Sequence, residues 1–138
     1  MDAIRNPPEL TDLAVSEALE TVLEIAGEDL RAFVEYDDKT YNPMFIAERV
    51  VDEFGGSEAV AEFADRLHYN YKLDFTEREM YEDLYEPLST LDAFAVYLED
   101  ETIVRYVNDR QGIYISVERG TYAGQVIDAL TDTLEDAT

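Results

Sequence analysis

The sequence predicts an α+β fold in which helices pack against a five-stranded antiparallel sheet. Segments with apolar residues at helical spacing predict helices near both ends and in the middle of the chain. Five short segments rich in β-branched and aromatic residues, separated by polar turns, predict strands. The predicted order is helix, two strands, helices, a three-stranded meander and helix, which a sheet packed with helices accommodates most simply.

The first half of the chain predicts a helix followed by a hairpin. Apolar residues recur at helical spacing within residues 9–26, and Gly27 follows as a helix terminator. Residues 30–36 and 41–46 then predict two strands joined by a polar turn. Pro43 lacks a main-chain donor, so we expect the second strand to be an edge or to be interrupted there.

The middle of the chain predicts three helical segments. Residues 48–54 predict a short helix that ends at a Gly-Gly pair. Ser57 is the expected N-cap of the next helix, which continues to Tyr71. Thr76-Glu77-Arg78-Glu79 has the form of a capping box, and the helix that follows ends near Tyr85, before Pro87.

The last part of the chain predicts an antiparallel meander and a closing helix. Residues 93–98, 102–107 and 112–117 are rich in β-branched and aromatic residues, and short polar turns separate them. Residues 123–134 place their apolar side chains on one helical face. The meander and the closing helix complete the predicted fold.

The composition predicts one folded domain with an extremely acidic surface. The chain has 138 residues, with 10 Lys and Arg against 33 Asp and Glu, and a formal net charge of −23. Because 46% of the residues are hydrophobic, the chain can bury a core and does not fall in the disordered class. We expect residues 1–138 to form a single domain, with 1–8 as an N-terminal arm and 135–138 as a polar tail.

The charge pattern predicts adaptation to molar salt. The acids are spread along the whole chain, and Lys39 and Lys72 are the only lysines. Like charges repel over about 10 Å at 0.1 M salt but over only about 3 Å at 1 M. The composition resembles that of haloarchaeal cytoplasmic proteins, which implies nonspecific association with hydrated cations such as K⁺. An acidic mimic of nucleic acid, bound to a basic protein, is the alternative interpretation of this charge.

Several functional classes are not expected from this sequence. It contains no cysteine, which excludes disulfides, thiolate nucleophiles and Cys-based zinc sites. The start lacks the pattern of a leader and no apolar run nears membrane-spanning length, so we expect a cytoplasmic protein that does not bind membranes. Scattered arginines outnumbered by acids also argue against direct nucleic-acid binding.

No residue pattern predicts a catalytic, cofactor or metal site. Asp65 and His68 form a D-x-x-H pair, yet a single histidine makes a weak metal site, and we expect His68 at the surface or its boundary. No serine lies in a G-x-S-x-G elbow. The Gly-Gly-Ser sequence before Glu58 lacks the lysine of a phosphate-binding loop, and we interpret it as a helix stop and restart.

The order of the predicted elements resembles that of roadblock/LC7 and profilin-like domains. In that layout a helix and hairpin are joined through a helix to a three-stranded meander and a final helix; the extra helix at 76–85 departs from it. The stretches 82–85, 91–97 and 112–117 are also similar to a family of small uncharacterised haloarchaeal proteins. The resemblance implies a fold and an environment, and it directs the function toward regulation or scaffolding.

Tyrosines around the middle helices are the candidates for contact with a partner. The chain has ten tyrosines, and tyrosine suits both interfaces and core boundaries. The leading hypothesis is a noncatalytic protein-interaction or regulatory module, expected to form a homodimer. The alternative is a small-molecule-binding domain or small enzyme with a carboxylate or tyrosine pocket between the sheet and the middle helices. The partner-contact candidates are His68, Tyr69, Tyr71, Tyr81 and Tyr85.

Overall fold

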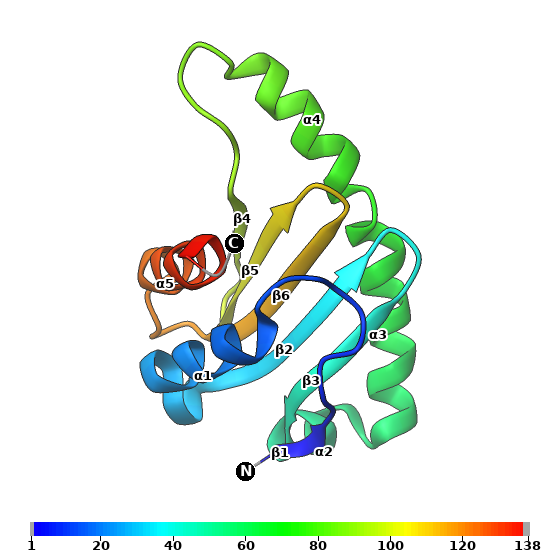
Figure 1. Ribbon diagram of the computed structural model, residues 1–138. Helices are drawn as coiled ribbons and strands as arrows, with labels where there is room; N and C mark the ends of the chain where they lie inside the picture. Colours follow the sequence, from blue (N-terminus) through cyan, green and yellow to red (C-terminus); the bar gives the residue numbers. More distant parts are fainter. Residues whose placement is uncertain (1, 137–138) are drawn as a thin grey trace.

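A six-stranded antiparallel sheet forms the centre of the structure, a computed structural model that describes residues 2–136 (Figure 1). The strand order is β1-β3-β2-β6-β5-β4, and all neighbouring strands are antiparallel. The predicted α+β class and the five predicted strands are confirmed. The strands are β1 (Asp2–Arg5), β2 (Leu30–Asp37), β3 (Tyr41–Ala47), β4 (Ala93–Tyr97), β5 (Glu101–Asn108) and β6 (Gln111–Glu118).

The strand β1 corrects the prediction of a five-stranded sheet. It lies in the segment expected to be an N-terminal arm and pairs with β3, where Ile4 is in register with Ile46. A segment of four residues is too short to show the alternation that marks a strand. The expectation that the second strand is an edge or is interrupted at Pro43 is wrong: β3 runs unbroken through Pro43 and lies between β1 and β2. Only its register with β2 shifts, between Pro43 and Phe45.

Helices connect the strands and lie on both faces of the sheet (Figure 1). Within residues 2–136, none of them has both the length and the apolar character needed to span a bilayer. They are α1 (Val15–Ala26), the 3₁₀ turn η1 (Gly27–Asp29), α2 (Glu48–Phe54), α3 (Ser57–Tyr71), α4 (Asp74–Leu84) and α5 (Ala123–Asp136).

A buried carboxylate explains why α1 begins at Val15 rather than near residue 9. Glu35 of β2 is fully buried and accepts hydrogen bonds from the main-chain N–H groups of Glu9, Leu10 and Thr11, at 2.8, 3.2 and 2.8 Å. These N–H groups therefore bind the sheet, and the segment stays non-helical until Val15. A contact between distant residues overrides the local helical pattern.

The two predicted N-terminal caps in the middle of the chain are wrong. Gly56, and not Ser57, is the N-cap of α3, and no side chain caps this helix. The helix α4 begins at Asp74, so Thr76 lies inside it and forms no capping box. The predicted stop and restart is confirmed: Gly55 and Gly56 have φ angles of 91° and 133°, which favour glycine, and they separate α2 from α3.

The main core lies between the sheet and the pair α1 and α5, which lie side by side on one face (Figure 1). Both helices present apolar residues at helical spacing to the sheet, as their sequences predict. Residues at the centre of this core are Val22 of α1, Phe33 of β2, Val104 of β5, Ile115 of β6 and Leu130 of α5.

A second, aromatic core lies on the opposite face, beside α3 and α4. Tyr36 is fully buried there, and its ring lies 5.5 Å from that of Phe75 and 5.8 Å from that of Tyr114. A Cβ atom at Gly112 would lie 2.8 Å from the Tyr36 ring, so glycine is required at this position for close packing. Phe75, in the first turn of α4, packs within this cluster and so attaches the helix to the sheet.

Candidate functional site

A buried polar cluster fixes α4 to the sheet. Asp74 is 2% exposed and accepts hydrogen bonds from the Tyr36 hydroxyl at 2.7 Å and from Arg105 Nε at 2.9 Å. The Arg105 guanidinium also lies over the rings of Tyr71 and Phe94, 4.6 and 5.2 Å from their centroids. Burial raises the pKa of Asp74, and the bonds from Tyr36 and Arg105 partly offset this rise. The cluster therefore ties the start of α4 to β2 and β5.

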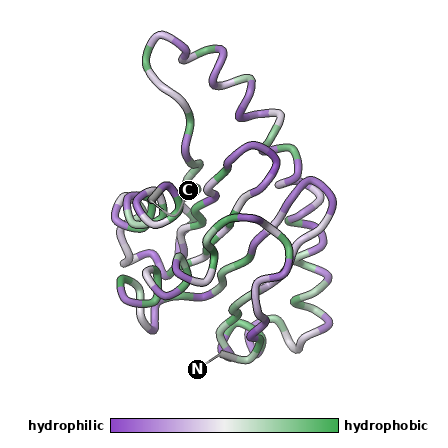
Figure 2. Tube along the Cα trace, in the orientation of Figure 1, coloured by the Kyte–Doolittle hydropathy of each residue, from purple (hydrophilic) through white to green (hydrophobic). Residues whose placement is uncertain are grey.

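The outer side of α4 exposes apolar side chains. Leu73, Met80 and Leu84 follow one another at helical spacing on this side, and they are 51%, 58% and 65% exposed. Leu88, in the turn after the helix, is 79% exposed. Figure 1 shows α4 projecting beyond the sheet, and Figure 2 shows hydrophobic residues interspersed with hydrophilic ones along it. Exposed apolar residues gathered in this way mark interaction surfaces more often than isolated ones do.

The segment between α4 and β4 is held against the helix that precedes it. Arg78 Nε donates a hydrogen bond to the main-chain oxygen of Leu91 at 3.3 Å, and the N–H of Leu91 donates to Glu82 at 3.1 Å. The Tyr81 ring lies 5.8 Å from that of Phe94 in β4. The helix α4 therefore supports the start of β4.

The strand β4 forms an apolar outer edge of the sheet, which we call the β4 edge (Ala93–Tyr97). Among the described residues it pairs with β5 on one side only, in regular register, and its sequence AFAVY carries no charge. The opposite edge strand, β1, is shorter, carries the charged residue Arg5, and has irregular pairing. Charges and bulges protect an edge strand against pairing with another chain. The β1 edge has both protective features, and the β4 edge has neither.

The predicted contact residues separate into buried and exposed groups. His68 and Tyr71 are each only 9% exposed and pack inside the chain. Tyr69 of α3 is 68% exposed and Tyr85, after α4, is 47% exposed. Tyr81 is partly buried, and its ring stacks on that of Tyr85 with centroids 6.3 Å apart. The structure therefore brings Tyr81 and Tyr85 together near the β4 edge, apart from the other three.

The D-x-x-H pair of α3 does not form a shared site. His68 is more buried than expected, and its Nε2 lies 2.8 Å from the main-chain oxygen of Asp37. Asp65 instead accepts a hydrogen bond from the Tyr41 hydroxyl at 2.6 Å. Burial, together with this bond, raises the pKa of Tyr41 to about 12. Among the described residues, no group of three or more His, Asp or Glu side chains could hold a metal ion.

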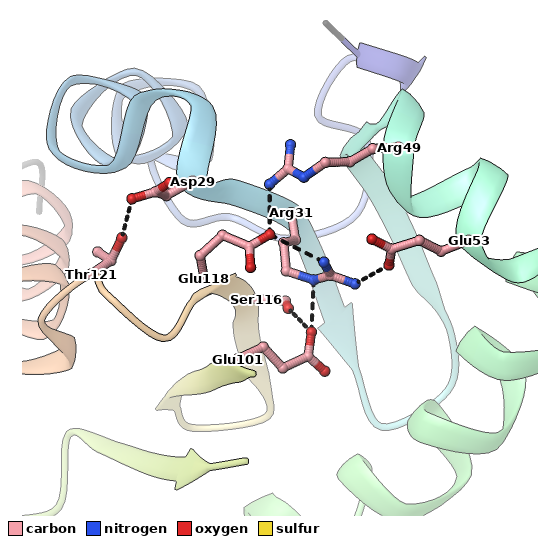
Figure 3. Close-up of polar contacts among 8 residues, drawn as sticks. All are labelled: Asp29, Arg31, Arg49, Glu53, Glu101, Ser116, Glu118 and Thr121. Carbon is pink, nitrogen blue, oxygen red and sulfur yellow. Dashed lines mark hydrogen bonds and ion pairs between the residues drawn. The ribbon is translucent and has the colours of Figure 1, made fainter. Parts of the chain in front are cut away.

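Arg31 of β2 lies at the centre of a polar cluster beside α2 (Figure 3). Its guanidinium lies 2.8 Å from Glu53, 3.2 Å from Glu118 and 2.7 Å from Glu101. Arg49 of α2 also contacts Glu118, at 3.0 Å. Burial alone would lower the pKa of Arg31, but the hydrogen bonds to Glu53 and Glu118 raise it above its ordinary value. The cluster ties α2 to three neighbouring strands.

Reasoning from the sequence missed the Arg31 cluster. The register between β2 and β6 shifts between Leu30 and Ala32, so alternation along β2 does not show which face Arg31 takes. The available signal is a charged residue within a predicted strand of mostly apolar residues. Its partners come from α2, β5 and β6, and only the folded chain brings them together.

An apolar cavity of about 70 Å³ lies between the sheet and helices α2 and α3. The alternative hypothesis expects a pocket with carboxylates or tyrosines between the sheet and the middle helices, which is where this cavity lies. Glu101 and Tyr114 line it, but the walls are mainly apolar and include none of the predicted contact residues. The apolar lining comprises Ala32, Val34, Ile46, Val50, Phe54, Val60, Phe63, Ala64, Leu67 and Ile103, and the polar lining comprises Arg31, Glu101, Tyr114 and Ser116.

Comparison with solved structures identifies the fold. MglC from Myxococcus xanthus is similar with a TM-score of 0.51 and 13% identity, over 88% of this chain and 93% of that chain. The gliding protein MglB from Thermus thermophilus is similar with a TM-score of 0.48 and 14% identity, over 99% and 98%. An MglB structure with tetrameric arrangement has a TM-score of 0.47 and 13% identity, over 98% and 100%.

The predicted resemblance to roadblock/LC7 domains is confirmed at the level of fold, since the observed order of helices and strands follows that layout with β1 and two further middle helices added. No curated protein matches the chain. A family model, by contrast, matches residues 16–137, which include every helix and strand except the start of α1 and the strand β1. The chain therefore belongs to the family described as "Domain of unknown function (DUF7522)".

Proposed function

We propose that this chain is a noncatalytic protein-interaction or regulatory module that acts as a homodimer, with the two copies joined at the β4 edge. The observation that carries the proposal is the contrast between the two edges of the sheet. The β4 edge is uncharged and regular, whereas β1 is charged and irregular. In a chain with 31% charged residues, an uncharged and exposed edge strand is suited to a partner.

A second copy of the chain is the partner that fits this edge. An antiparallel pair of identical β4 strands has a two-fold axis, so the contact closes at two copies and continues the sheet across both. Val96 and Tyr97 are 36% and 59% exposed, and such a contact would bury both side chains. Tyr81 and Tyr85 remain candidate contact residues in this proposal because they lie close to the start of β4.

Sedimentation equilibrium in about 2 M KCl, where charge repulsion is screened, tests the proposal. The unchanged chain is expected to sediment as a dimer. Val96→Lys places a charge on each copy within the strand that would form the contact, and we expect it to weaken dimerisation by about a hundredfold or more. Tyr122→Lys is the matched control, because Tyr122 is 79% exposed at the start of α5. A monomeric unchanged chain, or an equal effect of both substitutions, would overturn the proposal.

We also propose that the module is adapted to molar salt. The net charge of −23 on 138 residues makes the folded chain repel itself at low ionic strength. Raising KCl from about 0.1 M to about 2 M is expected to increase the melting temperature by about 10 °C. Thermal unfolding followed by circular dichroism measures this change.

A charge-reduced variant tests whether repulsion between carboxylates causes the salt effect. It carries three substitutions at exposed positions of α1 and η1: Glu20→Gln, Glu24→Gln and Glu28→Gln. We expect this variant to be more stable at low salt and less dependent on KCl. A melting temperature that does not change with KCl would contradict the adaptation.

A further inference from the structure

The apolar cavity beneath α3 results from small side chains on facing elements. Ala32 of β2 is in register with Ser116 of β6, and Ala64 of α3 lies across the cavity from them. Larger residues at these positions would fill the space. Protein interiors are otherwise close-packed, and the atoms that line a void lose dispersion contacts. A ligand of suitable shape would restore those contacts and so bind with favourable free energy.

One end of the cavity meets a strongly acidic pocket. Figure 3 shows the ion pair of Arg31 and Glu101. Both residues line both spaces, so this pair lies where the two meet. The acidic pocket is lined by five carboxylate residues against the single guanidinium of Arg31. Arg31 already binds three of these carboxylates. The other two, Glu99 and Asp100, belong to the exposed turn between β4 and β5.

We propose that this cavity and the acidic pocket together bind a small amphipathic cation, namely a short aliphatic chain that carries one ammonium group. The aliphatic chain enters the apolar cavity, and the ammonium stays among the carboxylates near Glu101. The excess of negative charge in the acidic pocket repels a carboxylate or phosphate ligand. Arg31 does not offset this repulsion, because its guanidinium is already paired with three carboxylates. A neutral chain would gain the apolar contacts only.

The size of the cavity limits the aliphatic chain. An apolar cavity of about 150 Å³ holds benzene, whereas this cavity measures about 70 Å³. By this scale about three carbons fit inside, and the fourth carbon of a butyl chain spans the distance to the carboxylates. We name n-butylammonium as the test cation, with butan-1-ol and butyrate as neutral and anionic probes of the same chain length.

Titration of the ¹⁵N-labelled protein, followed by NMR, tests the proposal. We expect n-butylammonium to shift the amide signals of Ala64, Ile103 and Ser116 in a saturable manner. Butan-1-ol is expected to bind about tenfold more weakly, and butyrate more weakly still. Equal binding of butyrate and n-butylammonium, or shifts that do not include the cavity residues, would overturn the proposal.

Two pairs of variants separate the apolar and charged parts of the site. Ala64→Leu fills the cavity and is expected to weaken n-butylammonium binding by about tenfold or more. Ala61→Leu is its matched control, because Ala61 is exposed on the same helix and should leave binding unchanged. The double variant Glu99→Gln and Asp100→Asn should weaken binding of the cation but not of butan-1-ol. Binding that is insensitive to Ala64→Leu would contradict the proposed site.

The result is independent of dimerisation. The cavity is lined by residues of the sheet, α2 and α3, but Val96 is in register with Ile103 of its lining, and the acidic pocket includes Leu98 next to the β4 edge. Dilution of the unchanged chain is therefore the suitable control: n-butylammonium should bind equally at low protein concentration, where the chain is monomeric, and at high concentration, where it is dimeric. Failure of the ligand site and failure of the dimer are thus separate outcomes.

Discussion

Replacing Asp74 by alanine is expected to lower the free energy of unfolding by about 4 kcal/mol. The substitution leaves the Tyr36 hydroxyl without an acceptor in the aromatic core and leaves the Arg105 guanidinium, with a side chain 12% exposed, without its carboxylate. Removing one partner of a buried pair costs more than the pair itself contributes, because the remaining charge is still desolvated. Urea unfolding in about 2 M KCl, a salt level at which charge repulsion is screened, measures the loss.

Two controls accompany the Asp74 variant. Asp74→Asn keeps an acceptor for Tyr36 and removes the buried charge, so its loss should be smaller than that of the alanine variant. Asp83→Ala lies on the same helix at an exposed position and should change stability little. If Asp74→Ala cost no more than Asp83→Ala, the polar cluster would not be what anchors α4.

The same variant connects stability with the proposed interface. Arg105 lies over Phe94 of β4, and Tyr81 of α4 packs against the same ring. Loss of Asp74 removes the partner that positions Arg105 and the start of α4. Both contacts with the Phe94 ring are therefore expected to weaken. We therefore expect Asp74→Ala to weaken dimerisation as well as folding, whereas Asp83→Ala leaves both unchanged.

Replacing Glu35 by alanine is expected to lower the free energy of unfolding by about 3 kcal/mol. Besides three main-chain N–H groups, the Thr11 hydroxyl and Asn42 Nδ2 donate to this carboxylate, at 3.0 and 2.7 Å. Asn42 is 4% exposed and cannot turn to water without local unfolding. Urea unfolding measures the loss, and hydrogen exchange should show that the amides of residues 9–11 become unprotected.

Matched variants test whether the carboxylate itself is responsible. Glu35→Gln keeps one acceptor oxygen but adds two donors in a site already filled with donors, so we expect an intermediate loss. Glu9→Ala removes an exposed carboxylate from the same segment and should have little effect. Equal stability of Glu35→Ala and Glu9→Ala would show that the N-terminal segment does not depend on Glu35.

The order of the elements could be predicted from the sequence because apolar periodicity is a local property. Residues 123–134 and the strands of the meander show it clearly, and the structure places a helix and three strands there. The helix starts at Val15 and Asp74 could not be predicted in the same way. At both places a buried carboxylate pairs with residues far away in the sequence, and the cost of an unpaired buried polar group exceeds local helix propensity.

The candidate sites were less predictable than the fold. Tyr69, Tyr81 and Tyr85 could be selected by residue type, but their type does not separate them from Tyr71, which packs against Tyr114 with ring centroids 5.2 Å apart. The cavity depends on Ala32, Ser116 and Ala64 meeting across three elements, which no local pattern reveals. The β4 edge did have a signal: its uncharged sequence is unusual in so acidic a chain.

Hydrogen exchange along β4 tests the central claim most directly. Alternate amides of this strand point away from β5 and have no partner strand among residues 2–136 of the same copy. At high protein concentration in about 2 M KCl, where charge repulsion is screened, we expect these amides to exchange slowly, and on dilution to exchange quickly while the β5 amides stay protected. Fast exchange of these amides at every concentration would contradict a dimer formed through the β4 edge.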